Sequence, residues 1–303
     1  MNKIHKKIVD NLCIYRQDIK TKGLYWSIIH RIYKIPYFKK IISPIVNLLK
    51  PDFLTIEGNQ MYIDKKDTAV SQELLLSGKW EEFETNLFKS NIKYGNIVLD
   101  IGAHIGYYTL IAAKIVGTKG KVYAFEPNQK TFEILKKNVE KNGYKNVILV
   151  NKAISDKNGQ AELYLNEENT GDHRLYNSRD KRKSIKVETI TLDTYFKDNN
   201  IKINLIKMDI QGSEVKALRG SKTIIKRNKD IKIISEFWPK GIKLSGEETI
   251  FYSKIFNKKK FKFYEINEQE KKLKKILFID FLKNLAHENS EYYTNLFIIK
   301  RDN

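Results

Sequence analysis

The sequence predicts an α/β protein in which helices cover both faces of a mostly parallel sheet, preceded by a separate helical extension. From residue 96 onward, short apolar segments of strand length alternate with longer segments whose apolar residues recur at helical spacing. This alternation is typical of parallel strands joined by right-handed helical crossovers. Residues 1–50, in contrast, show helical spacing alone and carry a strong positive charge. We therefore expect a basic helical N-terminal extension over 1–52 and an α/β domain over 53–303.

The composition excludes several classes of protein. Hydrophobic residues make up 41% of the 303 residues, which is enough for a full core and excludes a disordered chain. The longest uncharged stretch near the middle, 101–113, is too short and too glycine-rich to span a bilayer. A single cysteine, Cys13, excludes an internal disulfide. Because no apolar signal-peptide core opens the sequence, we expect a cytoplasmic protein.

The charge is strongly positive and unevenly distributed. The chain has 56 Lys and Arg against 36 Asp and Glu, a net charge of +20, which favours anionic partners. Residues 1–50 hold eleven Lys and Arg but two Asp, and their spacing predicts two basic amphipathic helices that end near Pro36. A short apolar stretch, 41–49, follows. These helices either cover the main domain or make peripheral contact with anionic lipid at the inner face of the membrane.

The elements of the α/β domain follow in order. Residues 53–62 fit a short strand or hairpin, and the polar insertion 155–185 holds a charged loop at 167–183. Helices are expected at 71–89, 107–116, 130–142, 214–226 and from 246 to 256. Strands are expected at 96–101, 121–125, 147–151, 161–165, 203–209, 231–237, 261–266 and 293–300.

The strongest motif is V-L-D-I-G-A-H-I-G-Y-Y-T at 98–109, a buried strand that ends in Asp100 and is followed by a Gly102–Gly106 turn opening a helix. Glycines let the backbone bend sharply and let a ligand approach it closely. In open α/β sheets, ligands bind at this carboxyl edge. A dinucleotide fold would need G-x-G-x-x-G, and an acid before the first glycine would repel a pyrophosphate. It suits a cationic ligand, so the motif favours S-adenosylmethionine (SAM), with its sulfonium and ammonium groups, over NAD.

The second motif is Y-A-F-E-P-N at 123–128, in which Glu126 ends the next strand. A carboxylate at this position can accept hydrogen bonds from both ribose hydroxyls of a nucleoside. The alternative is an acid exposed at the end of a strand. The glycine turn upstream favours the ribose role.

Together, these motifs resemble the FkbM family of SAM-dependent methyltransferases. The resemblance covers roughly 64–238 and extends through N-K-A-I-S-D, T-L-D-T-Y, I-K-M-D-I-Q-G-S-E, A-L-R-G-S and S-E-F-W-P. It implies a class I SAM-methyltransferase fold, a Rossmann-like three-layer sandwich whose last strand is antiparallel. It also implies O-methylation of sugar or polyketide hydroxyls, as in bacterial polysaccharide or natural-product biosynthesis, with S-adenosylhomocysteine (SAH) as the product.

The resemblance places the methionine part of SAM along the glycine turn. Asp100, Gly102 and Gly106 should line it, and Ala103 lies within the same turn. His104 also belongs to the turn and is expected at the edge of the substrate or behind the residues that touch it.

The nucleoside part is placed at the next two strand ends. Glu126 should hold the ribose, and the segment from Ala153 to Asp156 should border the adenine. Asn128 is a further candidate at the same edge.

Methyl transfer to a hydroxyl needs alignment of the reacting atoms and help with the proton. A sugar hydroxyl is a poor nucleophile, so a general base or a metal assists it. The candidates are Asp209, Glu214, Glu236 and His173. Asp209 ends the fourth strand and could instead cap the following helix. The family usually has D-x-E-G-x-E here, whereas this chain has Gln211 in place of the second acid, so a metal stays unassigned.

The charged loop contributes the remaining candidates. His173 lies in T-G-D-H-R-L, which either closes over the site or stays solvated. Lys207 is expected within its strand rather than in catalysis. Aromatic rings that could stack on a sugar are Tyr107, Tyr108, Tyr176 and Trp238. Basic residues that are either solvated or recognise an anionic acceptor, such as a phosphorylated or acidic glycan, are Arg174, Arg179, Lys181, Arg182 and Lys183.

Two other functions compete with a glycan or small-molecule O-methyltransferase. The charge of +20 suggests a nucleic-acid methyltransferase, but Asp209-Ile210-Gln211-Gly212 differs from the Asn/Asp-Pro-Pro-aromatic motif of amino methylation, and RNA-binding signatures are absent from the sequence. The third hypothesis is a SAM-binding scaffold without turnover, held at a membrane through residues 1–50. The intact glycine turn and Glu126 argue against lost cofactor binding. We therefore expect the O-methyltransferase.

Overall fold

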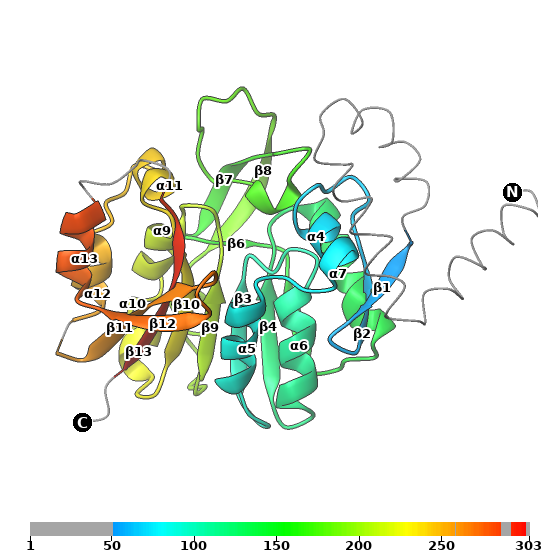
Figure 1. Cartoon of the computed structure of the whole chain (residues 1–303), viewed down its shortest axis with the longest axis horizontal. Coiled ribbons are helices and arrows are strands. Elements are labelled where there is room, and N and C mark those ends of the chain that lie inside the picture. Colours follow the sequence, from blue (N-terminus) through cyan, green and yellow to red (C-terminus); the bar gives the residue numbers. More distant parts are fainter. Residues whose placement is uncertain (1–50, 258, 286–291, 301–303) are drawn as a thin grey trace, which may run out of the picture.

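The computed structural model describes residues 51–257, 259–285 and 292–300 (Figure 1). Its centre is an eight-stranded sheet with the order β12-β11-β13-β10-β9-β3-β4-β5. The helices expected within 1–50 lie outside the described residues, so the extension over 1–52 stays a prediction. The strands of this sheet are β3 (Ile97–Ile101), β4 (Lys121–Phe125), β5 (Val147–Val150), β9 (Leu205–Met208), β10 (Lys232–Phe237), β11 (Phe261–Asn267), β12 (Lys272–Ile276) and β13 (Thr294–Lys300).

The sheet is parallel from the edge strand β5 to β10 and antiparallel on its other side. Strands β5, β4, β3, β9 and β10 run parallel, whereas β13 lies antiparallel between β10 and β11. The expected antiparallel last strand is confirmed. Because the chain moves outward from β3 to β5 and then returns to β9 beside β3, the ends of β3 and β9 form a switch point where α/β sheets bind ligands.

Helices pack on both faces of the sheet, and each face has its own hydrophobic core. Val98 belongs to one core and its neighbour Leu99 to the other, as alternation along a strand requires. In Figure 1, α5 and α6 lie in front of β3 and β4. The helices are α4 (Val70–Ser77), α5 (Glu82–Ser90), α6 (Tyr107–Val116), α7 (Gln129–Lys141), α8 (Leu192–Tyr195), α9 (Glu214–Arg219), α10 (Lys222–Arg227), α11 (Pro239–Leu244), α12 (Phe251–Ile255) and α13 (Phe278–Leu285). Across the described ranges, we find no helix with the length and apolar character needed to cross a bilayer.

A second, three-stranded sheet is built from the polar insertion. It has the order β6-β8-β7, formed by β6 (Ala153–Ile154), β7 (Gly159–Tyr164) and β8 (Ser184–Ile190). Figure 1 shows β7, β8 and the loop between them rising above the central sheet. The strand expected at 161–165 corresponds to β7, whereas β8 was not predicted, although S-I-K-V-E-T-I alternates in polarity over its whole length.

Two expected helices are each broken into a pair. The helix expected over 71–89 is α4 and α5, separated where Gly78 and Glu81 adopt left-handed φ values of +72° and +42°. The helix expected over 214–226 is α9 and α10, with Gly220 between them. A Cβ atom at Gly220 would lie 2.1 Å from the carbonyl oxygen of Ser155, so this glycine permits a close backbone contact with the insertion. Apolar spacing continues across both breaks, which is why periodicity alone predicted single helices.

A short hairpin and the segment after it complete the domain beside the glycine turn. Strands β1 (Phe53–Ile56) and β2 (Asn59–Tyr62) form the expected hairpin. The buried carboxylate of Asp67 follows it and accepts hydrogen bonds from the backbone N–H groups of Ser71 (2.6 Å) and Thr170 (3.1 Å). This segment therefore connects the start of α4 to the loop of the insertion.

Candidate active site

The glycine turn between β3 and α6 has the geometry that its sequence predicts. Gly102 has a φ of +82°, and a Cβ atom there would lie 2.0 Å from the backbone oxygen of Asp209. Gly106 has a φ of +96°, and its Cβ would lie 2.6 Å from Cδ1 of Leu135. Both positions therefore need glycine, and the turn leaves the backbone uncovered at the carboxyl ends of β3 and β9.

Asp100 is the penultimate residue of β3 and lies beside the glycine turn. Its side chain is buried and accepts a hydrogen bond from the hydroxyl of Thr109 at 2.5 Å. Burial raises the pKa of Asp100 to about 6. The carboxyl group is thus fixed in position, and a cationic ligand would favour its charged form.

Glu126 is held at the end of β4 by two backbone groups. Its Oε2 accepts a hydrogen bond from the N–H of His104 at 3.0 Å, and its Oε1 accepts one from the N–H of Asn128 at 2.8 Å. Burial raises the pKa of Glu126 to about 7. Each carboxylate oxygen can accept a second hydrogen bond. Glu126 is therefore oriented to receive two hydroxyl groups.

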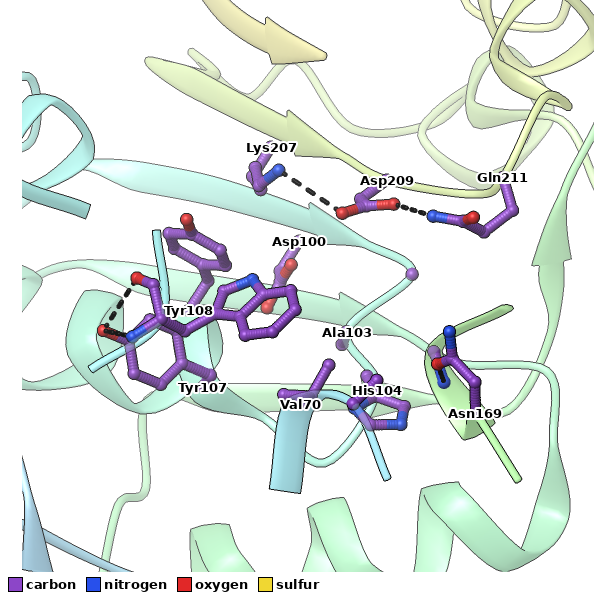
Figure 2. Close-up of a pocket in the computed structure, with 14 residues that line it drawn as sticks. Val70, Asp100, Ala103, His104, Tyr107, Tyr108, Asn169, Lys207, Asp209 and Gln211 are labelled. Atoms are coloured by element: carbon purple, nitrogen blue, oxygen red, sulfur yellow. Dashed lines mark hydrogen bonds and ion pairs between the residues drawn. The ribbon is translucent and has the colours of Figure 1, made fainter. Parts of the chain in front are cut away.

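Two adjoining cavities open at this edge of the sheet. The first has a volume of about 160 Å³ and is lined by Asp100, Lys207 and aromatic side chains. Figure 2 shows Lys207, Asp209 and Gln211 along one wall of it, with His104 and Asn169 across from them. The second, of about 60 Å³, is lined by Glu126 and mainly apolar residues. The residues that line both cavities are Gly102, His104, Gly171, Asp209 and Gln211.

A loop of the insertion, residues 166–176, covers both cavities, and we call it the cover loop. Nε2 of His104 lies 2.9 Å from the hydroxyl of Thr170, which joins the loop to the glycine turn. The backbone N–H of Thr68 also donates to the carbonyl oxygen of Glu168 at 2.8 Å. His104 itself has a left-handed φ of +49°, and burial lowers the pKa of its ring. One end of the cover loop is thus fastened to the glycine turn and the segment before α4.

The other end of the cover loop is fastened to the segments that follow β9 and β10. Tyr176 donates a hydrogen bond from its hydroxyl to the carbonyl oxygen of Gln211 at 3.0 Å. The guanidinium of Arg174 lies 4.7 Å from the ring centroid of Trp238. A Cβ atom at Gly241 would lie 2.0 Å from the same indole ring. Trp238 is therefore engaged by Arg174 and Gly241, which favours a structural role over stacking on a sugar.

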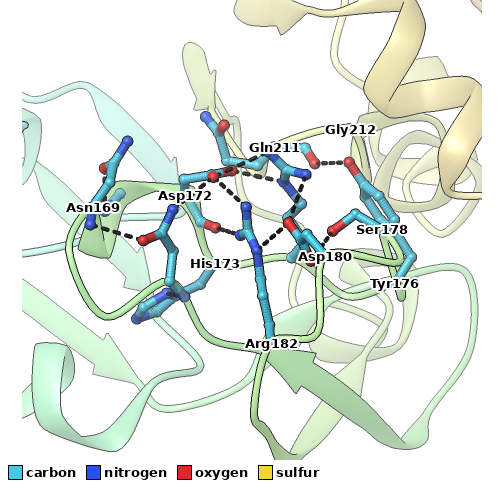
Figure 3. A network of polar contacts seen from close by, with 12 residues as sticks. Asn169, Asp172, His173, Tyr176, Ser178, Asp180, Arg182, Gln211 and Gly212 are labelled. Atoms are coloured by element: carbon cyan, nitrogen blue, oxygen red, sulfur yellow. Dashed lines mark hydrogen bonds and ion pairs between the residues drawn. The ribbon is translucent and has the colours of Figure 1, made fainter.

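Two arginines of the insertion converge on one carboxylate. Arg174 and Arg182 each approach Asp172 to 2.7 Å. Arg182 also approaches Asp180 to 2.6 Å, and Figure 3 shows it between Asp172 and Asp180. Because these guanidinium groups are neutralised inside the loop, they stiffen it rather than offer free charge to an acceptor. Arg179 and Lys181 have exposed side chains.

Asp209 lies where the two cavities meet. Its Oδ1 accepts a hydrogen bond from Nε2 of Gln211 at 2.8 Å, and the same amide lies 3.2 Å from Oε1 of Glu236. Burial, together with the charges of Asp209 and Glu214, raises the pKa of Glu236 well above its ordinary value. Asp209 retains 30% side-chain exposure. Gln211 therefore bridges a carboxylate at the cavity and a second acid that favours its protonated form.

Glu214 supports the turn that carries Gln211. It is fully buried, and its Oε1 accepts hydrogen bonds from the backbone N–H groups of Ile210 (3.0 Å) and Gly212 (3.2 Å). It lines neither cavity. The structure thus places Glu214 behind the site, where it fixes the backbone rather than contacting a ligand.

His173 and two other predicted residues are also placed by their hydrogen bonds. His173 lines the second cavity, where its Nδ1 accepts from the backbone N–H of Asn166 at 3.1 Å. Burial lowers the pKa of His173 to about 4. Asn128 caps α7 and lines neither cavity, and exposed Asp156 lies outside both. The structure therefore does not bring Asp156 or the side chain of Asn128 into the site, whereas Ala153 lines the second cavity.

Lys207 is the site residue that sequence reasoning missed. It lies within β9 as expected, but it also lines the first cavity. Nζ is 2.8 Å from Oε1 of Glu84 and 5.0 Å from the ring centroid of Tyr108. The sequence carries one signal of this position: Lys207 lies two residues before Asp209, and in a strand such residues lie on the same face. The structure adds that Lys207 is paired with Asp100 across β3 and β9.

The residues at this edge fit SAM. The second cavity joins apolar walls to a carboxylate suited to a ribose, and the first presents Asp100 and Asp209 to a cationic group. The glycine turn that joins them has no room for side chains at Gly102 or Gly106. In the part of the chain that the structure describes, no group of three or more His, Cys, Asp or Glu side chains is placed to hold a metal ion.

Comparison with known proteins supports the same assignment. The methyltransferase FkbM domain family matches residues 100–269. A hexuronic acid methyltransferase, AglP, of Haloferax volcanii is 28% identical over 127 residues, which are 41% of this chain and 49% of that protein. A probable cobalt-precorrin-6B C(15)-methyltransferase of Sulfolobus acidocaldarius is 39% identical over 83 residues, which are 27% of this chain and 40% of that protein. The chain thus spans less than half the length of these two relatives.

Among solved structures, a putative methyltransferase from Streptococcus mutans in complex with SAH is similar with a TM-score of 0.44 and 13% identity. The match covers 73% of this chain and 97% of that one. The family match takes in the glycine turn, Glu126 and Asp209, which the fold gathers at the two cavities. The chain belongs to the FkbM family of SAM-dependent methyltransferases and has the class I methyltransferase fold.

Proposed function

We propose that the chain is an O-methyltransferase acting on a hydroxyl group of a sugar, a glycan or another small-molecule acceptor. When bound, SAM supplies a methyl group on a positively charged sulfur, which an oxygen nucleophile can accept. The acceptor hydroxyl must then lose a proton. The observation that carries the proposal is the position of Asp209, a partly exposed carboxylate where the two cavities meet.

Asp209 is the general base in this proposal. Gln211 fixes its Oδ1 by a hydrogen bond of 2.8 Å, so the carboxylate has a defined orientation. The raised pKa of Glu236 favours a proton there, which leaves the negative charge of the bridged pair on Asp209. Glu236 and Glu214 are then positioning residues: one takes the other end of the Gln211 amide, and the other holds the turn.

His173 is poorly suited to act as the base. Its pKa of about 4 keeps the ring neutral at pH 7. Its Nδ1 accepts a backbone hydrogen bond, so the proton of the neutral ring resides on Nε2. A nitrogen that carries a proton can donate to a ligand in the second cavity, but it cannot take the acceptor's proton.

The cofactor residues follow from the same geometry. Glu126 would hold the ribose hydroxyls, and Ala153 would border the base. The glycine turn from Gly102 to Gly106, with Ala103 and His104 within it, would lie along the aminoacyl part together with Asp100. Asn128 would act indirectly, because its backbone N–H orients Glu126.

Within this proposal, a sugar acid is the first acceptor class to test, and one relative supports it. The relative AglP is a hexuronic acid methyltransferase, and a uronic acid carries a negative charge. Arg179 and Lys181 lie exposed on the same insertion as the cover loop and can attract such an acceptor. Nucleic acid is the second candidate, favoured by the net charge of +20.

Transfer of labelled methyl from SAM to a panel of acceptors tests the proposal. The panel holds oligosaccharides that contain uronic acids, the matching neutral oligosaccharides and structured RNA. The expected product is an alkali-stable methyl ether on a sugar, identified by mass spectrometry. Label that appears on RNA alone would favour the second candidate, and label released by mild alkali would indicate an ester on the carboxylate and contradict O-methylation of a hydroxyl.

A further inference from the structure

The first cavity has a buried cation in its wall. Among the described residues that line it, Lys207 is the only lysine or arginine, and its side chain is 2% exposed. Figure 2 shows Lys207 beside Asp209, with Asp100 below them. Burial lowers the pKa of Lys207, but the charges of Glu84 and Asp209 outweigh burial and raise it above its ordinary value. The side chain therefore carries a full positive charge at the cavity.

The contacts of Lys207 leave room for another partner. Its Nζ lies 2.8 Å from Oε1 of Glu84, whereas Oδ2 of Asp209 is 3.8 Å away, beyond hydrogen-bond distance. An ammonium group has three N–H donors. The other contact in the described structure is the ring of Tyr108, at 5.0 Å. A ligand in the cavity can therefore accept a hydrogen bond from Lys207 while the pair with Glu84 stays in place.

Structural pairing alone does not account for a charge at this point. An apolar pair of similar volume often packs as well as a buried ion pair, so pairing with Glu84 is not by itself a reason for a lysine here. Asp100 and Asp209 line the same cavity, and the charge of Asp100 suits an ammonium group. They would, however, repel any anionic group that entered beside it. A cation in the cavity wall would allow a ligand that carries both an ammonium and an anionic group to bind.

The position of the cavity identifies the end of the ligand that enters it. Glu126 in the second cavity suits a ribose, and the two cavities meet at Gly102, His104 and Asp209. A SAM molecule whose nucleoside occupies the second cavity extends its other end into the first. That end is an amino acid, with an ammonium and a carboxylate on one carbon.

We propose that Lys207 binds the carboxylate of the aminoacyl end of SAM, while Asp100 faces its ammonium. Lys207 is then a specificity residue that separates amino-acid-bearing adenosyl ligands from adenosyl ligands without the carboxylate. This inference concerns the cofactor alone and does not depend on which acceptor the enzyme methylates.

Calorimetric titration of the full chain with three ligands tests it. The ligands are SAH, decarboxylated SAH, which lacks only the carboxylate, and 5′-methylthioadenosine, which lacks the whole amino acid. The wild-type chain should bind SAH about 10- to 100-fold more tightly than decarboxylated SAH, as expected for a hydrogen bond between charged groups. Equal affinity for these two ligands would overturn the proposal, and this comparison needs no variant.

The variant comparison assigns the preference to Lys207. Lys207→Met alone would leave Glu84 buried without a partner, so the test uses the double variant Lys207→Met with Glu84→Gln. It should bind SAH and decarboxylated SAH equally, with an affinity for 5′-methylthioadenosine within about threefold of the wild type. Lys202→Met, at an exposed ion pair with Asp230, is the matched control and should keep the full preference. A double variant that binds 5′-methylthioadenosine normally and still prefers SAH would contradict the assignment.

The result is separable from the proposed function. Binding of these ligands can be measured without any acceptor, so loss of the carboxylate preference says nothing against O-methylation. Conversely, an acceptor panel that yields no methyl ether leaves the role of Lys207 intact if the wild-type chain discriminates the two ligands.

Discussion

The Nε2 atom of His104 lies 2.9 Å from the hydroxyl oxygen of Thr170, and this contact joins the glycine turn to the loop that covers the site. It lies at the junction of the two cavities, since His104 lines both. A ligand that occupies both cavities would therefore lie against this contact. Through this contact, the glycine turn both lines the cavities and holds the cover loop.

Thr170→Val should loosen the cover loop and speed the release of SAH. Loss of one hydrogen bond between neutral groups predicts a dissociation rate about 2- to 10-fold higher, because such a bond contributes about 0.5–1.5 kcal/mol. Stopped-flow displacement of a fluorescent SAH analogue measures the rate. Thr118→Val, which removes an exposed contact with Tyr94, is the matched control. An unchanged dissociation rate in Thr170→Val would show that the loop does not gate the ligand.

Glu126→Ala should abolish tight binding of adenosyl ligands. Two hydroxyl groups that donate to an ionised carboxylate contribute about 1.5–3 kcal/mol each, so the affinity for SAH should fall by at least about 100-fold. Calorimetry measures it, with Glu162→Ala on an exposed position of β7 as the control. Retention of wild-type affinity would contradict the assignment of the ribose site.

The affinity for SAH should rise with pH between about 6 and 8. The pKa of Glu126 is raised by burial to about 7, so below that pH the free protein holds a proton on this group. Hydroxyl groups of a ribose donate more strongly to the ionised form, and binding therefore releases the proton. The dissociation constant should fall up to about tenfold per pH unit below the pKa and then level off. Glu126→Gln should remove this dependence, and a wild-type profile that stays flat across the range would count against it.

Gln211→Glu should slow methyl transfer while leaving SAH binding largely intact. The amide of Gln211 donates to Asp209 and lies 3.2 Å from Glu236, whereas a carboxylate there would lose the donor and add a negative charge beside Asp209. We expect the rate to fall about tenfold or more, with its acid limb moved to higher pH, because like charges raise the pKa of the base. Gln160→Glu, at an exposed position of β7, is the control. A normal pH–rate profile in Gln211→Glu would refute the bridging role.

Much of the site could be predicted because it lies at strand ends. Asp100, Glu126 and Asp209 each follow a run of apolar residues of strand length, and parallel strands bring such positions to one edge. The glycine turn before α6 could be predicted too, because it directly follows a strand end in the sequence. In the structure, a side chain at Gly102 would clash with the backbone of Asp209. These features are local in sequence even though their assembly is not.

The rest depends on contacts between distant segments. The pairing of Lys207 with Glu84 joins residues that are 123 positions apart, and apolar patterning predicts only that Lys207 lies in a strand. The role of Trp238 was equally hidden, because it is Arg174 of the cover loop that occupies its ring. Asn128 looked like a ligand residue by position, but it caps α7. The breaks at Gly78 and Gly220 leave the apolar spacing unchanged, so helical periodicity could not locate them.

The central claim is that Asp209 takes the proton from the acceptor hydroxyl, and one variant tests it most directly. Asp209→Asn keeps the shape of the side chain and its contact with Gln211 but removes the base. With Asp230→Asn, at an exposed ion pair, as the control, SAH affinity and the single-turnover rate of methyl transfer are measured on the same preparations. The account predicts SAH affinity within about threefold of the wild type and transfer slower by about 10²- to 10⁴-fold. Full transfer activity in Asp209→Asn would contradict it.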